Sequence, residues 1–472
     1  MPTAPDLSGL IKSYDVRGLV DVELTDQVAI AIGAAFADAI VLPDGHTKVV
    51  IGHDMRDSSE RLASDVETGL GIRGVDVLHI GLCSTDGLYH ASGALDLPGV
   101  MITASHNPAE YNGMKLCRTR ARAVGENSGL ADVRALAEQY LALGLPLPDG
   151  TEFGSTERVD MLVEYGAFLR GLVPLDAIRP LRVVVDAANA MAGHTVPAVL
   201  GTDAGLPALP LEIIPLYFEL DGNFPNHEPN PLDAENLRDL QAAVLEHGAD
   251  IGLAFDGDAD RCFVVDEKGA VVTASAITCL VGLRETAREI ARGGSPTVIH
   301  NLISSRAVAE QLAEAGATPV RSRVGHSFIK ADMARLNAVF GGEHSAHFYF
   351  RDFFYADSGM LAAMHVLAAL GEQPRPLSEL LEPHAPYTAS GEINSRVDDV
   401  VAATDRVREA FSPGAEVDEM DGLTIDKWPS EQRWLNVRPS NTEPLLRLNV
   451  EAADPAVMER VRDAALATIR GE

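Results

Sequence analysis

The sequence predicts an α/β protein built from three α/β units followed by a smaller α+β unit. Short apolar runs alternate with helical periodicity over most of the 472 residues, which is the pattern of sheets covered by helices. The pattern begins again twice, and the C-terminal part changes to two β-like runs around a polar turn. Because one hydrophobic core rarely serves a chain of this length, we expect several domains.

In the first unit, we expect strands at Val49–Gly52, Val75–Gly81 and Gly99–Thr103. A helix is expected at Ser58–Leu70, with a serine as its N-cap. Strands and helices in this order predict a parallel arrangement of the strands.

The second and third units repeat this order. The second has an expected strand at Leu181–Asp186, an amphipathic helix at Asp233–His247 and a strand at Ile251–Phe255. The third has a strand at Val298–Asn301 and a helix at Ser305–Ala315 that ends at a glycine.

The last unit has β-like runs at Trp434–Val437 and Leu445–Val450. Pro/Gly-rich or polar turns at Leu145–Gly150, Asp266–Gly269 and Gly371–Pro376 are the expected seams. We therefore predict four domains, at 1–154, 155–267, 268–375 and 376–472.

Composition narrows the classes of function. A net charge of −31 makes nucleic acid and anionic membrane surfaces poor partners. Four scattered cysteines without a Cys-x-x-Cys pair argue against a zinc site or a disulfide framework. The cysteine usage suits a reducing cytosol, and we expect a cytoplasmic protein with no signal peptide and no membrane span.

The most informative stretch is Val100–Pro108, in which an apolar run leads into Ser105-His106-Asn107-Pro108. Proline lacks an N–H and restricts the residue before it, so Asn107-Pro108 ends the strand. Ser105 is therefore expected on a loop at a strand end, where open α/β sheets place their chemistry.

A triplet of carboxylates, Asp256, Asp258 and Asp260, follows the apolar strand at Ile251–Phe255. The three oxygen ligands can converge on a hard cation if the backbone curls at Gly257. An EF-hand is the first alternative, but a strand precedes the loop and arginine stands where that motif needs glycine. A plain acidic turn is the second alternative.

Gly69-Leu-Gly-Ile-Arg-Gly74 matches a dinucleotide-binding pattern by its letters. The helix comes before it and the strand after it, which is the inverse of the required order. We interpret it as the end of a helix followed by turn glycines.

Four further polar segments carry candidate binding groups. Val324–Lys330 and Gly341–His347 are expected as glycine-containing polar loops whose histidines could move protons, with structural hydrogen bonding as the alternative. Arg438–Arg447 places guanidinium groups around hydroxyls and an amide, which suits a phosphate; a solvated turn is the alternative. Lys12–Gly18 adds cations on what is otherwise a surface loop.

Tyr111–Lys115 contains Asn-Gly, which by itself predicts a hairpin turn. Such a turn would bring Lys115 near Ser105.

Taken together and in this order, these segments resemble the α-D-phosphohexomutase family, and within it the phosphomannomutase/phosphoglucomutase branch. The resemblance covers nearly the whole chain. It implies three similar α/β/α domains with mixed sheets and a C-terminal α+β domain like the TATA-box-binding protein, around a central cleft.

The resemblance also implies roles for individual residues. Ser105 would carry the phosphoryl group, and Asp256, Asp258, Asp260 and the seryl phosphate would hold Mg²⁺. Glu343 and Ser345 would bind sugar hydroxyls. The non-reacting phosphate of the substrate would be held by Arg438, Ser440, Asn441, Thr442 and Arg447. The reacting end of the substrate would be lined by Tyr14, Arg17, His106, Lys115, Arg261, His326 and His347.

The implied reaction interconverts mannose 1-phosphate and mannose 6-phosphate, with glucose phosphates as further substrates, through a hexose 1,6-bisphosphate that also activates the enzyme. Phosphoglucomutase, phosphoglucosamine mutase and a Mg²⁺-dependent sugar phosphatase are the alternatives. Hexose phosphates are the expected partners of a monomer or homodimer.

Three positions depart from the family pattern. Ala346 stands where glycine is common, Ser84-Thr85-Asp86 replaces a Pro-Thr-Pro turn, and the strand Asn301–Ser305 lacks a nearby lysine.

Overall fold

The computed structural model describes residues 5–145, 152–439 and 445–471. Two compact units emerge from its internal contacts, and each is described by itself. The first consists of residues 1–272, 333–340 and 345–380, and the second of residues 273–332, 341–344 and 381–472, within the described ranges.

The first sheet has the strand order β1-β5-β4-β2-β3-β7, with β6 paired to β5. Strands β4, β2, β3 and β7 are parallel, whereas β5 runs antiparallel to both β4 and β1. The sheet is therefore mixed. Its elements are β1 (Val16–Leu19), α1 (Asp26–Phe36), β2 (Lys48–His53), α2 (Ser59–Ile72), β3 (Asp76–Leu82), α3 (Thr85–Leu95), β4 (Gly99–Ile102), β5 (Tyr111–Arg118), β6 (Arg122–Ala123), α4 (Leu130–Leu143) and β7 (Thr156–Arg158).

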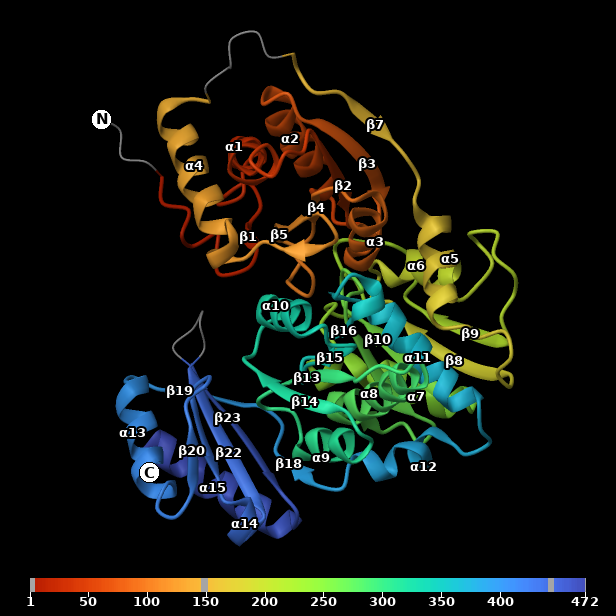
Figure 1. The fold of residues 1–472 in the computed structure, drawn as a ribbon, viewed down its shortest axis with the longest axis vertical. Coiled ribbons are helices and arrows are strands. Elements are labelled where there is room, and N and C mark those ends of the chain that lie inside the picture. The colour runs from red at the N-terminus through yellow and green to blue at the C-terminus, as the bar shows by residue number, and fades with distance from the viewer. Residues whose placement is uncertain (1–4, 146–151, 440–444, 472) are drawn as a thin grey trace. The chain divides into compact units, whose positions relative to one another are not determined.

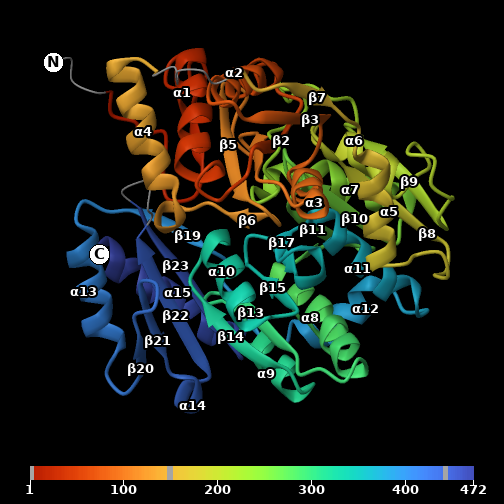
Figure 2. The ribbon, with the colours of Figure 1, turned by 45° about the horizontal axis from the view of Figure 1, so that its top comes forward.

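Both faces of this sheet are covered, because alternate residues of its strands enter different cores. Val49 and Ile51 of β2 pack in the core that contains residues of α1, α2 and α4, whereas Val50 packs in a separate core with Leu88 of α3. Figure 2 shows α1 and α4 side by side, with α3 apart from them. Strands covered on both faces read as continuous apolar runs, as β2 and β4 do.

The second sheet has the order β12-β11-β10-β8-β9. Strands β10, β8 and β9 are parallel, and β11 turns back antiparallel to β10. The loop between β10 and β11 carries the aspartate triplet. The elements are α5 (Leu162–Leu172), β8 (Leu181–Asp186), α6 (Ala192–Val199), β9 (Leu211–Leu216), α7 (Arg238–His247), β10 (Ile251–Phe255), β11 (Cys262–Asp266) and β12 (Val271–Val272).

The following part of the chain contributes to both units. Strands β13 and β14 pair in parallel in the second unit, and β16 and β17 pair antiparallel in the first. The elements are α8 (Ala274–Ala291), β13 (Thr297–Asn301), α9 (Arg306–Glu314), β14 (Thr318–Ser322), α10 (His326–Leu336), β15 (Phe340–Gly342), β16 (Phe348–Phe350), β17 (Ala356–Asp357), α11 (Gly359–Gly371) and α12 (Leu377–Leu381).

The C-terminal part forms an antiparallel sheet in the order β18-β23-β22-β21-β20, with β19 also paired to β23. Helices α13 and α15 pack together and share its core (Figure 1). The expected α+β unit is therefore present. Its elements are β18 (Thr388–Ala389), β19 (Ile393–Arg396), α13 (Val400–Phe411), β20 (Glu416–Asp418), β21 (Leu423–Asp426), α14 (Trp428–Glu431), β22 (Arg433–Pro439), β23 (Leu445–Ala452) and α15 (Pro455–Arg470).

Two local expectations are wrong. Asn112-Gly113 is not a hairpin turn but lies inside β5, where β1 and β4 pair with it on both sides. The segment at 324–330 is not a loop throughout, because α10 begins at His326. By contrast, the interpretation of Gly69–Gly74 as a helix end is confirmed, since α2 ends at Ile72 and Gly74 has φ +76°.

Candidate active site

Ser105 lies in the turn that follows β4, and its backbone is held in an unusual conformation. Its φ is +49°, in the left-handed region that residues other than glycine rarely adopt. Its N–H donates to Thr103 Oγ1 at 3.0 Å. The side chain is thus displayed in one direction rather than continuing the strand.

The guanidinium of Arg56 holds this loop through its backbone carbonyls. Arg56 is 3% exposed and donates to the carbonyl oxygens of Ser105 (3.0 Å), Asn107 (2.6 Å), Pro108 (2.7 Å) and Tyr111 (3.0 Å). The sequence alone indicated no role for Arg56. No local signal could have predicted it, because its partners lie about fifty residues further on.

Arg17, at the start of β1, contacts the same loop. Its Nη1 donates to the carbonyl oxygen of Ala104 at 2.9 Å and to Asn107 Oδ1 at 2.6 Å. Asp15 holds its other nitrogen at 2.7 Å. The structure therefore places Arg17 against the loop that carries Ser105, on a strand rather than on a surface loop.

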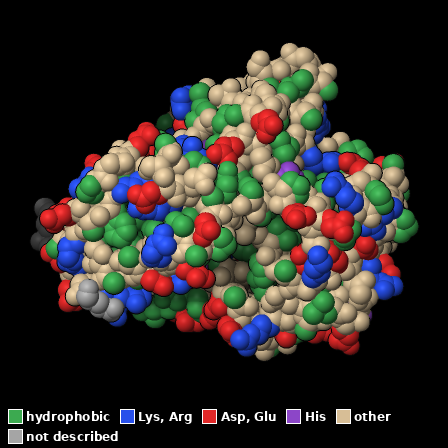
Figure 3. Space-filling view, turned by 90° about the horizontal axis from the view of Figure 1, so that it is seen from below, with side chains coloured by type: hydrophobic (Ala, Val, Ile, Leu, Met, Phe, Trp, Pro, Cys, Tyr) green, Lys and Arg blue, Asp and Glu red, His purple; other side chains and the backbone are tan. Residues whose placement is uncertain are grey.

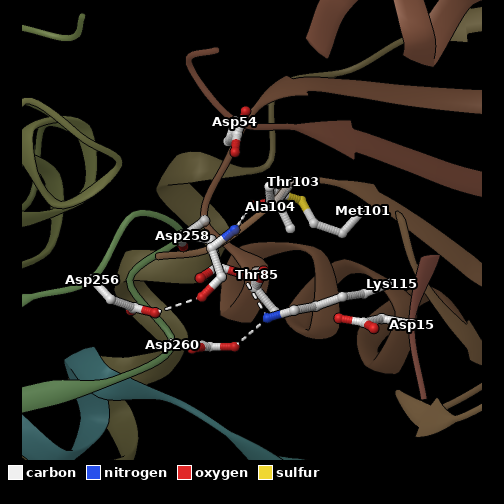
Figure 4. A network of polar contacts seen from close by, with 12 residues as sticks. Asp15, Asp54, Thr85, Met101, Thr103, Ala104, Lys115, Asp256, Asp258 and Asp260 are labelled. Carbon is white, nitrogen blue, oxygen red and sulfur yellow. Dashed lines mark hydrogen bonds and ion pairs between the residues drawn. The ribbon is translucent and has the colours of Figure 1, made fainter. Parts of the chain in front are cut away.

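The aspartate loop between β10 and β11 meets the Ser105 loop directly. Ser105 Oγ donates to Asp256 Oδ2 at 2.8 Å, and Arg261 Nε donates to the same oxygen at 2.8 Å. Figure 4 shows Asp260 pointing toward the end of the Lys115 side chain, whereas Asp256 points away from it toward the serine hydroxyl to which it is bonded. A Cβ at Gly257 would lie 2.1 Å from the carbonyl oxygen of Ser105, so the close approach of the two loops requires glycine there.

Lys115 joins the other two carboxylates from β5. Its Nζ lies 2.6 Å from Asp258 Oδ2 and 2.5 Å from Asp260 Oδ2. Thr85 Oγ1 donates to Asp258 Oδ2 at 2.5 Å, and the Thr85 N–H donates to the Asp258 carbonyl at 3.0 Å. These contacts fix the middle of the aspartate loop.

Burial governs the charges here. It raises the pKa of Asp256 and, with the charge of Asp258, that of Asp260. Burial alone would raise the pKa of Asp258 as well, but the ammonium of Lys115 outweighs it and holds that pKa below its ordinary value. Burial likewise opposes the charge on Lys115, and Asp258 and Asp260 outweigh it and raise the Lys115 pKa.

The aspartate triplet fits a hard divalent cation. Each carboxylate offers one oxygen atom, these three oxygens all lie within 4.8 Å of one another, and all three side chains are buried. Among the described residues, Asp258 Oδ1 is buried without a hydrogen-bond partner. Three carboxylates face two cations, Lys115 and Arg261, which leaves negative charge for a metal with a preference for oxygen.

His106 is placed to exchange a proton with Ser105. Its Nδ1 lies 3.2 Å from Ser105 Oγ. Burial and the charges of Arg261 and Arg17 lower the pKa of His106 well below its ordinary value, so the imidazole is neutral at neutral pH. A neutral imidazole beside a hydroxyl can accept its proton.

His347 and Ser345 belong to the same unit. A backbone bridge joins Arg261 to His347, and His347 Nε2 lies 3.6 Å from Asp260 Oδ1. Ser345 Oγ lies 3.0 Å from His347 Nδ1. Ala346, between them, has φ +64°, which explains why glycine suits this position.

Glu343 and His326 lie in the second unit. Glu343 is 2% exposed and accepts from the N–H of Gly325 at 2.9 Å, just before α10 begins at His326. A buried carboxylate held by a glycine amide therefore lies next to this histidine.

The arginine pair of the C-terminal sheet also lies in the second unit. Arg438 on β22 and Arg447 on β23 are cross-strand partners. Both approach Glu392, at 3.0 Å and 3.4 Å. Burial and the two arginines lower the pKa of the adjacent His344 to about 3. Sequence reasoning found the arginines but missed Glu392 and His344, which nothing in the local sequence connects to them.

The remaining predicted residues are placed less fully. Tyr14 is half-buried in the turn before β1. Ser440, Asn441 and Thr442 lie outside the described residues.

Comparison with known proteins identifies the family. The chain matches the four domains described as phosphoglucomutase/phosphomannomutase, alpha/beta/alpha domains I, II and III and C-terminal domain, over residues 9–139, 164–269, 276–387 and 392–468.

Similar proteins extend over nearly the whole chain. It is 40% identical over 466 residues to a phosphomannomutase of Escherichia coli K12, covering 98% of each chain. It is 40% identical to a protein named phosphohexose mutases from Xanthomonas campestris, covering 95% of this chain and 96% of that one. A phosphoglucomutase/phosphomannomutase family protein of Burkholderia thailandensis has a TM-score of 0.85 at 30% identity, covering 98% and 97%.

The fold and these relatives define a phosphotransferase mutase. The chain belongs to the phosphoglucomutase/phosphomannomutase family, and it is a phosphohexomutase. No helix in the described part of the chain is both long and apolar enough to cross a membrane.

Proposed function

We propose that the enzyme interconverts mannose 1-phosphate and mannose 6-phosphate, and also accepts glucose phosphates, through a phosphorylated Ser105 and a hexose 1,6-bisphosphate. The contact of Ser105 Oγ with Asp256 Oδ2 at 2.8 Å carries the proposal, because it joins the displayed serine to an acidic loop from another sheet. The preference for mannose rests on relatives named phosphomannomutase that are about two-fifths identical over nearly the whole chain.

In the first step, the phosphoryl group would leave Ser105 Oγ for the free hydroxyl of the substrate. The substrate hydroxyl loses a proton and Ser105 Oγ regains one, so that the proton count is unchanged. In the second step, the other phosphoryl group of the bisphosphate would pass to Ser105 Oγ. Here Ser105 Oγ loses a proton and the sugar oxygen that gives up the phosphoryl group takes one up, so the proton count is again unchanged. We assign the Oγ proton of this step to His106, which is neutral and 3.2 Å away.

The charge on the transferring group would be balanced by Lys115, Arg261 and Arg17. Asp256, Asp258, Asp260 and the seryl phosphate would hold Mg²⁺, which supplies further positive charge to the phosphoryl oxygens when bound. Lys115 is suited to balancing the charge of the transferring group, because it stays protonated and its Nζ lies within 2.6 Å of two of the carboxylates that would hold Mg²⁺.

The opposite end of the substrate is assigned to the residues carried over from the family resemblance. Glu343 and Ser345 would bind the sugar hydroxyls, and Tyr14, His326 and His347 would line the reacting end. The non-reacting phosphate would be held by Arg438, Ser440, Asn441, Thr442 and Arg447. The cross-strand pairing of Arg438 and Arg447 supports a site for a dianion.

The test is a coupled assay with mannose 1-phosphate, Mg²⁺ and a trace of glucose 1,6-bisphosphate. Wild-type protein should form mannose 6-phosphate, and intact mass should show one phosphate per chain. Ser105→Ala should lose both, whereas Ser64→Ala, on the exposed face of α2, should retain both. Release of inorganic phosphate without mannose 6-phosphate would contradict the mutase and favour a phosphatase.

A further inference from the structure

Asp86, near the start of α3, is a buried carboxylate to which the mechanism above assigns no role. It lies in the Ser84-Thr85-Asp86 segment and has no exposed surface. A carboxylate is seldom buried without several donors, because its desolvation is costly.

Three hydroxyl groups from three separate elements donate to Asp86. Tyr165 Oη of α5 donates to Oδ2 at 2.8 Å, and Ser358 Oγ donates to Oδ2 at 2.6 Å. Ser84 Oγ donates to Oδ1. Ser84 and Ser358 are also the N-caps of α3 and α11, where they accept from Gly87 and Leu361. One carboxylate therefore ties together the N-termini of two helices.

Both of these helix N-termini contact the aspartate loop. On the α3 side, Thr85 donates to Asp258 through its hydroxyl and through its N–H. On the α11 side, Gly359 packs so closely that a Cβ there would lie 2.7 Å from the carbonyl oxygen of Arg261 and 2.8 Å from that of Ala259. The hydrogen bonds of Asp86 named above all come from hydroxyl groups, so Asp86 acts on the aspartate loop through these helix N-termini rather than directly.

We propose that Asp86 is a positioning residue for the metal site. By holding Ser84 and Ser358, it fixes the two helix N-termini between which the aspartate loop is clamped, and so fixes the spacing of Asp256, Asp258 and Asp260. This inference rests on the proposed function, because it takes the triplet to be the cation site. It extends that function to a residue that touches neither the metal nor the substrate.

The electrostatics of the cluster agree with this arrangement. Burial raises the pKa of Asp86 to about 6, while the three hydroxyl donors oppose that rise. The carboxylate is thus mostly ionised at neutral pH and accepts from all three. Two helix N-termini beside it also favour a negative charge.

The test measures binding of Mn²⁺ by electron paramagnetic resonance, with Mg²⁺ as competitor, on folded protein in the absence of substrate. Asp86→Asn keeps the shape but can no longer accept from all three hydroxyls. We expect its Kd for Mn²⁺ to rise about tenfold, as for other residues that orient metal ligands. Tyr165→Phe, which removes one donor, should raise it by about threefold.

Glu451→Gln serves as the matched control. Glu451 is a buried carboxylate of β23 that accepts from Trp434 and from the N–H of Arg306, in the other unit. Its replacement should lower the melting temperature but leave the Kd for Mn²⁺ unchanged. Melting temperatures of all variants show that each is folded at the temperature of the titration.

The outcomes separate the two claims. Tight binding of Mn²⁺ to wild-type protein that Asp258→Asn abolishes, with equal affinity in Asp86→Asn, would overturn the positioning role and leave the proposed function intact. Equal weakening by Asp86→Asn and Glu451→Gln would also overturn it, since general destabilisation would then be the cause. Absence of Mn²⁺ binding by wild-type protein would overturn both.

Discussion

At the scale of single residues, Gly257 sets how closely the serine loop and the aspartate loop approach. A Cβ at Gly257 would lie 2.1 Å from the Ser105 carbonyl oxygen, so Gly257→Ala must push the loops apart. We expect a loss of about 1–3 kcal/mol in unfolding free energy, as for other overpacked sites. Phosphorylation of Ser105 by glucose 1,6-bisphosphate, followed by intact mass, should slow more than tenfold.

The control for this substitution is Gly171→Ala. Gly171 lies within α5 and a Cβ there would meet no atom within 4 Å. Alanine should therefore stabilise the helix by about 0.5–1 kcal/mol and leave phosphorylation unchanged. If Gly257→Ala behaved like this control, the close approach of the loops would have no functional meaning.

The raised pKa of Asp86 predicts that one contribution to the free energy of unfolding decreases as pH rises. Its pKa is about 6 in the folded chain against 3.8 for an ordinary aspartate, so the folded protein binds this proton more tightly than the unfolded chain does. Its contribution to stability therefore falls as pH rises from about 4 to about 6, by about 3 kcal/mol in all at roughly 1.4 kcal/mol per unit.

Asp86→Asn removes this titration. Urea unfolding of both proteins between pH 4.5 and 7.5 should show the stability of wild type, relative to the variant, decreasing as pH increases. A difference that is constant with pH, or that increases with pH, would contradict a raised pKa.

At the scale of secondary-structure elements, β22 and β23 place Arg438 and Arg447 opposite each other, and both arginines form ion pairs with Glu392. Arg438 and Arg447 lie 3.0 Å and 3.4 Å from its carboxylate. A phosphate dianion must displace this carboxylate or share the arginines with it. Glu392→Gln should therefore tighten the binding of inorganic phosphate by up to about tenfold at low salt, with less effect at high salt.

Isothermal calorimetry would measure this affinity. Glu416→Gln, an exposed carboxylate of β20 in the same sheet, makes the same change in net charge and should have little effect. Equal effects of the two substitutions would show that only the overall charge matters.

Much of the strand and helix pattern could be predicted from the sequence. Strands at 181–186 and 251–255 have the predicted bounds, and the helix expected at 58–70 is observed as Ser59–Ile72. These elements have strong local signals, in apolar runs or helical periodicity. Asn112-Gly113 was misread because pairing on both sides of β5 outweighs its local preference for a turn.

The site was predictable in part, for the same reason. Ser105, Lys115 and the aspartates lie in recognisable motifs, and the structure brings them together. Arg56, Asp86 and Glu392 act through partners far along the chain. Asp86 and Ser358, for example, are separated by 272 positions, and no local pattern connects such residues.

At the scale of the whole molecule, an acidic chain must bind an anionic substrate. The net charge is −31, and Figure 3 shows acidic side chains interspersed with basic ones over the face drawn. Long-range steering therefore does not favour a hexose phosphate, and capture depends on short-range groups. Within the first unit, we expect Lys115, Arg261 and Arg17 to supply these charges; in the structure all three are engaged by carboxylates or loop carbonyls.

The negative charge of the three aspartates should also couple binding of a divalent cation to the stability of the folded chain. The triplet brings three carboxylates together only in the folded chain, so a divalent cation should bind the folded form and raise its stability. At a Mg²⁺ concentration about one hundred times its Kd, the gain is about 2.7 kcal/mol. Differential scanning calorimetry with Mg²⁺, and with NaCl at the same ionic strength, would separate specific binding from screening.

Asp258→Asn decides between these causes. This substitution removes one oxygen ligand and leaves a net charge of about −30. General screening by Mg²⁺ is therefore almost unchanged, because it depends on ionic strength rather than on one residue. Specific binding predicts that the stabilisation by Mg²⁺ beyond that by NaCl disappears in this variant. Stabilisation of equal size in both proteins would mean that Mg²⁺ acts on the acidic surface as a whole, and the aspartate loop would then not be the cation site.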